Sequence, residues 1–435
     1  MKGYSKYKVC DISWIDKIPE HWDIRKMKYT FTERSEKNHP DEQILCATQS
    51  QGVIPQAMYD NRVVVVNKGF ENLKFVKKGD FVISLRSFQG GIEYAYYQGI
   101  ISAAYTILNP NKIIDSEFAK YLLKSHQFIE LLKTCVTGIR EGQNINYDIL
   151  RKKFLPIPPF SEQQHIVSFL DEKTAKIDEY IDKKNKEIEA LKEWKKALIA
   201  HVVTKGLNTN AKMKDSGVSW IGEIPEHWKV KTLRHYLKMV SVKGFPDETL
   251  LSVVREQGVI VRNTESQEEN HNFIPDDLSG YKLVKKGQFA INKMKSWQGS
   301  YGVSQYQGIV SPAYYVCDLN FDNKRFFNEA IRSQVYIPFF TQYSKGIRVG
   351  QWDLSPIGLK SIPFIEPPIE EQQEIVEYID AATTKADRMI VELTNHVESM
   401  KEYKQRLIAD VVTGKINVQP CNLFMNNAYV NEQGS

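Results

Sequence analysis

The chain has 435 residues, of which 42% are hydrophobic, so it can form two to four folded domains and is not disordered throughout. Its longest apolar run, residues 63–66, is far short of a membrane span, and the N-terminus lacks the apolar core of a secretion signal, so we expect a cytoplasmic protein. The net charge of +5 divides into +6 up to residue 210 (32 Lys and Arg, 26 Asp and Glu) and −1 beyond it (26 and 27), so a nucleic acid would have to be bound by local patches of charge.

The two halves of the chain carry the same landmarks at nearly constant spacing. Ser-Trp-Ile-x-x-Ile-Pro-Glu-His-Trp occupies residues 13–22 and 219–228, and Val-Lys-Lys-Gly occupies residues 76–79 and 284–287. Gly-Ile-Arg and Glu-Gln-Gln recur in the same way, at 138–140 with 346–348 and at 162–164 with 371–373. A duplicated framework that differs between its landmarks indicates one scaffold built twice to meet two different targets.

Residues 11–159 read as a mixed α/β globule. Residues 63–66 and 81–85 are strand-like, and Gly, Pro and Asn punctuate the segments between them. The spacing of apolar residues from Phe118 to Leu132 predicts a helix over residues 116–133. The same order recurs over about residues 216–366, so we predict a second globule of the same kind.

A long helix is predicted after each globule. Proline-rich stops occupy residues 156–159 and 363–368, and neither Gly nor Pro interrupts residues 161–205 or 369–413. Ser161 is a candidate N-cap for the first helix, and Glu162 would lie in the first turn, where negative charge is favoured.

A heptad pattern runs along both predicted helices. Polar residues stand at equivalent places in the two patterns, Thr174 with Thr383 and Lys195 with Lys404, which would fix the pairing register. The matched seams favour an antiparallel coiled coil with internal pseudo-twofold symmetry; the alternative is that each helix covers its own globule. Helices of this length would span ~60 Å and could act as a spacer between the globules. The apolar positions expected to pair are Leu170, Ile177, Ile181, Ile188, Leu191, Leu198, Ile379, Ile390, Leu393, Val397, Met400 and Leu407.

The predicted organisation therefore has five parts. Two globular domains occupy residues 1–159 and 207–366, and each is followed by a long helix, at residues 160–206 and 367–415. Residues 416–435 form a tail that we expect to be flexible.

The residues offer no catalytic constellation. Residues 157–160, Ile-Pro-Pro-Phe, resemble the [ND]-P-P-[FYW] motif of amino-methyltransferases, but isoleucine stands where that motif needs Asn or Asp. The five cysteines are scattered without a CxxC pair, which argues against a zinc site and a disulfide framework. His21 and His227 each precede a tryptophan, and we expect them to pack there rather than to act in catalysis. We predict neither a catalytic residue nor a metal site.

Segments with cations, amides and glycine recur at matched places and suit DNA. Lysine turns could contact phosphates, although a solvated hairpin turn explains them equally well: Lys77, Lys78, Lys285 and Lys286. A second pair of segments carries residue types that bond guanine and adenine edges: Arg86, Ser87 and Gln89, and Lys293, Lys295, Ser296 and Gln298.

A glycine-flanked loop is the strongest single candidate for a DNA-facing element. It presents Arg140, Gln143 and Asn144 in the first half, and Arg348 and Gln351 in the second. The structural alternative is a turn that aims the chain toward its final strand and the proline stop.

The landmarks resemble those of a known family. Residues 214–228 resemble the opening of a target-recognition domain in the specificity subunits of type I restriction-modification systems. Residues 155–166, repeated at 362–375, resemble the same family's junction between recognition domain and helix. The resemblance covers about residues 10–415, and the first opening departs mildly, with Asp16-Lys17 where the second has Gly222-Glu223.

Membership would imply a DNA-recognition subunit without catalysis of its own. Each recognition domain would read one half of a split, asymmetric site on double-stranded DNA. The paired helices would set the gap and dock two adenine methyltransferase (modification) subunits, and restriction/translocase subunits would join for ATP-dependent cleavage. S-adenosylmethionine, ATP and magnesium would be bound by those partners and not by this chain. Specificity residues vary between family members, so the DNA contacts above come from the residues alone.

Two other classes of function compete with this interpretation. A stand-alone DNA methyltransferase or nuclease would need catalytic residues that we do not find. A coiled-coil adaptor without DNA contact would be unaffected in duplex binding by removal of the charges at Arg140 and Arg348.

Overall fold

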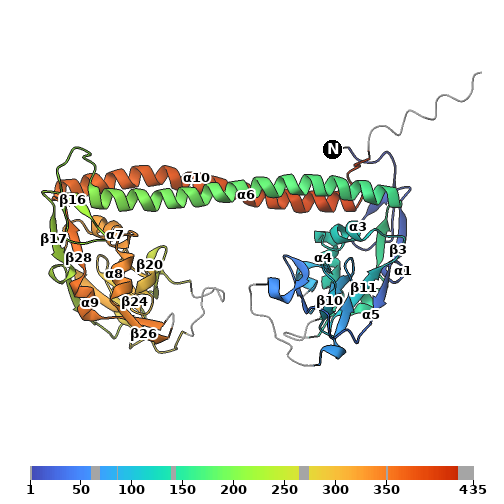
Figure 1. Ribbon diagram of the computed structural model, residues 1–435, viewed down its shortest axis with the longest axis horizontal. Coiled ribbons are helices and arrows are strands. Elements are labelled where there is room, and N and C mark those ends of the chain that lie inside the picture. Colours follow the sequence, from blue (N-terminus) through green and yellow to red (C-terminus); the bar gives the residue numbers. More distant parts are fainter. Residues whose placement is uncertain are drawn as a thin grey trace, which may run out of the picture. The chain divides into compact units, whose positions relative to one another are not determined.

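The computed structural model describes residues 2–59, 69–85, 87–138, 144–263, 274–348 and 351–419, without the side chains of residues 347, 348 and 351. The chain forms two compact units, unit 1 from Met1–Lys184 with Asn395–Ser435 and unit 2 from Asn185–Thr394. Each unit holds one globule and one half of each of two long helices, α6 (Phe160–Lys205) and α10 (Ile369–Val412) (Figure 1). The predicted mixed α/β class with paired long helices is confirmed. The units divide within the helices, so the predicted domain limits stay a prediction.

The globule of unit 1 is built on an antiparallel four-stranded sheet. Its order is β4 (Phe31–Arg34), β11 (Thr106–Pro110), β8 (Phe81–Ile83) and β9 (Glu93–Tyr94). Two-stranded pairs surround it: β1 (Tyr7–Val9) with β2 (Lys17–Pro19), β3 (Asp23–Lys26) with β14 (Phe154–Ile157), β5 (Leu45–Thr48) with β6 (Gly52–Pro55), β7 (Lys74–Val76) with β10 (Gly99–Ile101), and β12 (Val136–Thr137) with β13 (Asn144–Ile145). The helical segments are α1 (Met27–Thr30), η1 (Gln56–Met58), η2 (Phe70–Asn72), α2 (Ser87–Gly90), α3 (Ser116–Leu122), α4 (His126–Lys133) and α5 (Tyr147–Leu150).

Unit 2 repeats this plan sheet by sheet. Its four-stranded sheet has the order β18 (Leu237–Val240), β25 (Tyr315–Leu319), β22 (Phe289–Ile291) and β23 (Tyr301–Val303). The two-stranded pairs are β15 (Met213–Asp215) with β16 (Glu223–Pro225), β17 (Lys229–Thr232) with β28 (Pro363–Glu366), β19 (Leu251–Val254) with β20 (Gly258–Val261), β21 (Lys282–Val284) with β24 (Gly308–Val310), and β26 (Ser344–Arg348) with β27 (Gln351–Leu354). The helical segments are η4 (Leu233–His235), η5 (Ser296–Gln298), α7 (Lys324–Arg332), α8 (Ile337–Gln342) and α9 (Pro356–Ser361).

Two local predictions were wrong. The helix predicted over residues 116–133 is two helices, because the hydroxyl of Ser125 donates to the carbonyl of Leu122 (2.7 Å) and ends the first of them. Ser161 is not an N-cap, because α6 already begins at Phe160 and places Ser161 inside its first turn. The strand-like residues 63–66 lie outside the described residues.

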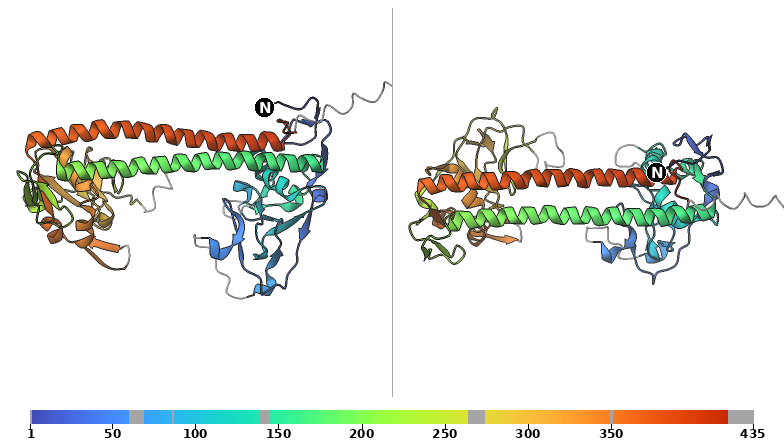
Figure 2. Two further views of the ribbon diagram at one scale, coloured as in Figure 1. Left: turned by 45° about the horizontal axis from the view of Figure 1, so that its top comes forward. Right: turned by 90° about the horizontal axis from the view of Figure 1, so that it is seen from above.

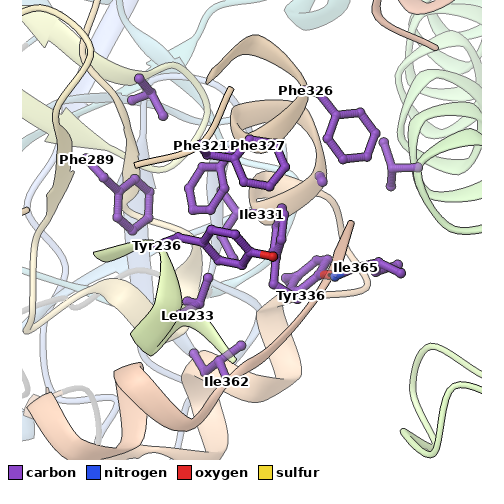
Figure 3. Packing of buried hydrophobic residues seen from close by; sticks show 14 of the residues in the cluster. Leu233, Tyr236, Phe289, Phe321, Phe326, Phe327, Ile331, Tyr336, Ile362 and Ile365 are labelled. Carbon is purple, nitrogen blue, oxygen red and sulfur yellow. The ribbon is translucent and has the colours of Figure 1, made fainter. Parts of the chain in front are cut away.

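Aromatic side chains fill the core of unit 2. Phe321, Phe326 and Phe327 come together with residues of β28, α8 and η4 around one buried cluster (Figure 3). Apolar residues of both long helices belong to the same cluster, among them Val202 and Ile379. The globule and its helical segments therefore share one hydrophobic core within the unit.

Within each unit, the halves of α6 and α10 lie side by side and run antiparallel (Figures 1 and 2). In unit 1, His165 near the start of α6 contacts Gln419 beyond the end of α10 (3.2 Å), and further along Lys404 Nζ lies 2.6 Å from a carboxylate oxygen of Asp178. In unit 2, the equivalent ion pair joins Lys195 and Asp387. The twelve predicted pairing residues are all buried or half-buried.

Candidate nucleic-acid interface

The lysine turns are exposed, and local interactions fix their backbone conformation. In each turn a glycine adopts a left-handed backbone conformation, Gly79 with φ +90° and Gly287 with φ +85°. Residues with a Cβ atom disfavour this conformation, so the turn needs glycine. A side-chain oxygen closes each turn, since Asp80 accepts from the backbone of Lys77 (2.8 Å) and Gln288 from that of Lys285 (2.7 Å). Lys77, Lys78, Lys285 and Lys286 all face solvent, and the turn geometry suits both the phosphate-contact and the solvated-turn interpretation.

The second pair of candidate segments divides into exposed and buried residues. Ser87 is fully buried, and its hydroxyl accepts from the backbone of Ser84 (2.8 Å). Ser296 is also fully buried, with its hydroxyl 3.3 Å from that of Ser344. Because both hydroxyls are bonded inside the fold, they do not face a ligand at the surface. Gln89 and Lys295 are exposed, Lys293 and Gln298 are half-buried, and Arg86 lies outside the described residues.

The described parts of the glycine-flanked segments belong to two equivalent strand pairs, β12–β13 and β26–β27. Asn144 is exposed at the start of β13, whereas Arg140 and Gln143 lie outside the described residues. In unit 2, Arg348 and Gln351 are paired at the loop end of the β26–β27 ladder, with an irregular register beside them, and their side chains are not described.

In unit 2 these hairpin and loop segments form one surface, which we call the hairpin patch: Lys293, Lys295, Trp297, Trp352 and Asp353. The two indole rings lie 5.1 Å apart between centroids, and Lys293 Nζ lies 2.7 Å from a carboxylate oxygen of Asp353. This hydrogen bond raises the pKa of Lys293, so the lysine stays charged at neutral pH. Aromatic rings beside cations are suited to contact both bases and phosphates.

The same two segments meet in unit 1, where α2 contacts β13. The lysine turns lie elsewhere. Gly79 is next to Ser116 at the start of α3, and Gly287 is next to Lys324 at the start of α7. Those helices contact the long helices, in unit 1 through Tyr121 with Asp171 (2.5 Å) and in unit 2 through Arg325 with Asp380 (2.9 Å). The structure therefore brings two of the three predicted kinds of segment together and leaves the lysine turns on the helix side of each globule.

Two half-buried cations that the residue pattern did not indicate bond to backbone carbonyls of the globules: Lys124 in unit 1 and Arg332 in unit 2. Lys124 Nζ donates to the carbonyls of Gly90 (2.8 Å) and Gln49 (3.1 Å), and forms an ion pair with the buried Glu93 (2.7 Å). Burial raises the pKa of Glu93 to about 7, although the ammonium of Lys124 opposes that shift.

Arg332 takes the place of Lys124 in unit 2. Its guanidinium donates to the carbonyls of Arg255 (3.0 Å), Glu256 (2.9 Å) and Tyr301, and burial lowers its pKa. A cleft of about 350 Å³ beside it is also lined by Gln298. Lys124 and Arg332 are 208 positions apart, as are the neighbouring helix caps Asp115 and Asn323, so an alignment of the two halves could have found them.

The described residues include no group of three His, Cys, Asp or Glu side chains placed to hold a metal ion. Within the same part of the chain, no helix is long and apolar enough to cross a membrane.

Comparison with known proteins identifies relatives of the chain. A family model described as the type I restriction modification DNA specificity domain matches residues 9–190. The type I restriction enzyme MjaVIII specificity subunit of Methanocaldococcus jannaschii is 25% identical over 80% of this chain and 81% of its own length. The putative MjaX specificity subunit of the same organism is 24% identical over 93% of this chain and 96% of its own length.

The fold also has a solved counterpart. A chain from work on complex assembly and conformational transition of the type I R-M system matches with a TM-score of 0.65 at 12% identity, over 92% of this chain and 99% of that one. At this identity the match bears on the fold alone, and it agrees with two α/β globules joined by long helices.

Proposed function

We propose that the chain is a specificity subunit of a type I restriction-modification system, and that its two globules each read one half of a split, asymmetric DNA site. One observation carries the proposal: every described sheet of unit 1 has a counterpart in unit 2, while the equivalent hairpins carry Asn144 in one half and Trp352 in the other. A common framework with different contact residues suits two different half-sites. The chain itself would contribute no catalysis.

The proposed DNA-facing surface of each globule is formed by its hairpin and the adjoining loop. In unit 2 this is the hairpin patch, with Arg348 and Gln351 at the end of the ladder. In unit 1 it includes Gln89 and Asn144, which are exposed; Arg86, Arg140 and Gln143 lie outside the described residues and stay candidates from the sequence. Lys77, Lys78, Lys285 and Lys286 would contact phosphates, which supplies affinity without sequence information.

Methylation mapping tests this proposal directly. The chain is expressed in a methylation-free host with and without a type I modification subunit, and adenine methylation is mapped across the genome. We expect a split motif only when both are present. Replacement of residues 207–366 by another recognition domain should change one half of that motif and leave the other intact. Methylation by this chain alone would contradict the non-catalytic assignment.

We further propose that the paired helices dock two modification subunits, one in each unit. Exposed apolar side chains stand at equivalent positions on one edge of each helix pair, Tyr180 with Tyr403 in unit 1 and Trp194 with Met389 in unit 2. Tyr180 follows Asp171 by nine positions, which at about 100° per residue places it on the side of α6 opposite the contact with α3. Aromatic anchors of this kind are typical of interface centres.

Charge at these positions tests the docking. Tyr180→Lys with Tyr403→Lys should prevent co-purification of one of the two modification subunits, and Trp194→Lys with Met389→Lys should prevent the other. The matched control is Asp182→Lys with Glu398→Lys, at exposed positions of the same helices on the other edge. Unchanged stoichiometry in both pairs of variants would place the modification subunits elsewhere.

A further inference from the structure

The first turn of α6 is bonded to the globule of unit 1 through one carboxylate. Glu162 is buried, with a side chain only 4% exposed. It accepts from the indole of Trp22 (3.0 Å) and the hydroxyl of Tyr4 (2.5 Å), and its second oxygen lies 2.8 Å from His21 Nε2. Three groups of the globule or its leading segment thus converge on one residue of the helix.

Unit 2 repeats this arrangement at the start of α10. Glu371 accepts from the indole of Trp228 (2.9 Å) and lies 2.5 Å from His227 Nε2. We call each set a carboxylate joint, consisting of Glu162, His21 and Trp22 in unit 1 and of the equivalent residues in unit 2. The sequence analysis treated Pro-Glu-His-Trp and Glu-Gln-Gln as separate landmarks and expected the histidines only to pack. The structure shows that the two landmarks bond to each other.

Each joint links a strand pair of its globule to the start of the long helix. Trp22 directly precedes β3, β3 pairs with β14, and β14 leads through two prolines into α6. The amide of Gln163 donates to the carbonyl of Pro158 (2.9 Å), and the amide of Gln372 does the same for Pro367 in unit 2 (2.8 Å). The connecting prolines therefore lie between a paired strand and a bonded helix start. A change in the angle between helix and globule at these prolines would break the bonds to the carboxylate.

The favourable effect of negative charge at a helix N-terminus does not by itself explain why Glu162 and Glu371 bond to the globules. Negative charge in the first turn of α10 is already supplied by Glu370, which is exposed. The second carboxylate, Glu371, is bonded to an indole and an imidazole of the globule, and these bonds fix the direction of the helix start because both donors must point at defined oxygen positions.

We propose that the carboxylate joints are positioning elements that fix the angle of each globule on its long helix and thereby limit the spacing between half-sites that the chain accepts. The spacing role rests on the proposed function. The angle itself is a property of the chain without DNA.

The two joints differ in how far their carboxylates are buried. The ring of Tyr4 stands edge-on to that of Trp22, with centroids 5.9 Å apart, and helps to cover Glu162. In unit 2 the side chain of Glu371 is 32% exposed and lines a pocket of about 210 Å³. We therefore expect loss of the joint in unit 1 to change the accepted spacing more than the same loss in unit 2.

The experiment uses Glu162→Gln and Glu371→Gln in the full chain, with Glu179→Gln and Glu392→Gln as controls at exposed positions of the same helices. A plasmid library presents both half-sites with the gap lengthened or shortened by one base pair, and methylation is read by sequencing. We expect methylation at the altered gaps, relative to the native gap, to rise about tenfold in Glu162→Gln and less in Glu371→Gln, with half-site sequences unchanged. The controls should match the wild type.

A conservative pair separates positioning from general stability. His21→Gln retains an N–H donor and should keep the native gap preference, whereas His21→Ala should relax it. Hydrogen exchange of residues 160–166 in the chain without DNA should be faster in Glu162→Gln and His21→Ala, and unchanged in Glu179→Gln.

The outcomes are distinguishable. Faster exchange with an unchanged gap preference would make the joint merely structural and overturn the proposal, leaving the proposed function intact. Unchanged exchange in Glu162→Gln would show that the carboxylate does not hold the helix start, and would also overturn it. If the wild type with its modification subunit methylated no split site, the proposed function and the spacing role would fall together, while exchange would still report whether the joint holds the helix.

Discussion

The two globules share a framework but pack it with different side chains. In unit 2, Phe340 is stacked on Tyr301 with ring centroids 3.8 Å apart, whereas the equivalent residues of unit 1 are Leu132 and Ile92, both fully buried. Strand order and pairing are nevertheless the same in both. The pattern of buried positions thus determines this topology, and apolar side chains of different shape satisfy it.

Polar contacts, unlike the apolar core residues, are retained between the two units. The glutamate of each carboxylate joint and the His-Trp pair that bonds it are identical in the two units, and a half-buried cation donates to backbone carbonyls in both, as Lys124 or Arg332. A buried polar group needs a partner at a defined position, while a buried methyl group needs only contact. Between two copies of one scaffold, the retained polar contacts mark the places where geometry is under constraint.

The largest expected effect tests the independence of the two cores. Phe340→Ala removes a fully buried ring that stacks on Tyr301 and should lower the free energy of unfolding of unit 2 by about 3–5 kcal/mol. Leu132→Ala is the matched change in unit 1. Hydrogen exchange should show each loss confined to its own unit, and equal loosening of both units would contradict separate cores.

Removal of Lys124 or Arg332 should have a somewhat smaller effect. Lys124→Met leaves the carboxylate of Glu93 without its ion-pair partner and should cost about 2–4 kcal/mol in unit 1. Arg332→Met deprives three backbone carbonyls of unit 2 of their donor. Each variant should weaken recognition of one half-site only, as measured by methylation of sites with single-base changes. Loss of both half-sites in either variant would show that the cation serves the whole chain.

The pH dependence of stability should distinguish Glu93 from other carboxylates. Its pKa is raised from 4.5 to about 7, so the folded state binds this proton more tightly than the unfolded state. The stability of unit 1 should therefore fall as pH rises from about 4.5 to about 7, with no further change from this group above that range. Denaturant unfolding of Glu93→Gln across these pH values should give a flatter profile. A slope identical to that of the wild type would assign the pH dependence to other groups.

Residue pattern alone predicted the elements that depend on long, regular burial. The positions from Leu170 to Leu407 that repeat every three or four residues did identify two paired helices. Features set by a few local bonds were not predictable, such as the break at Ser125 and the start of α6 before Ser161. Burial of Ser87 was also missed, because a hydroxyl looks the same in sequence whether it faces DNA or a neighbouring backbone amide.

The same limit applies to the candidate site. Periodicity could not indicate Lys124 or Arg332, since each works through contacts with segments more than thirty positions away. The duplication itself held that information, because an alignment of the halves pairs the two cations. Side chains that contact DNA stay a prediction, because residue type alone does not show which exposed side chains meet a base or a phosphate.

The smallest expected effect concerns the ion pairs between the long helices. Lys404 with Asp178 in unit 1 and Lys195 with Asp387 in unit 2 are equivalent contacts between half-exposed side chains, so each should contribute only about 0.5–1 kcal/mol. Their importance would lie in register, because a shift of one helix by one heptad would separate both pairs. Asp178→Lys should lower the melting temperature slightly, and the exchanged pair Asp178→Lys with Lys404→Asp should restore it. Asp182→Lys serves as the control, since it adds the same charge at an exposed position of α6. If the exchanged pair were no more stable than Asp178→Lys alone, the register would depend on the apolar seam by itself, and the two polar positions common to both helices would have no part in setting it.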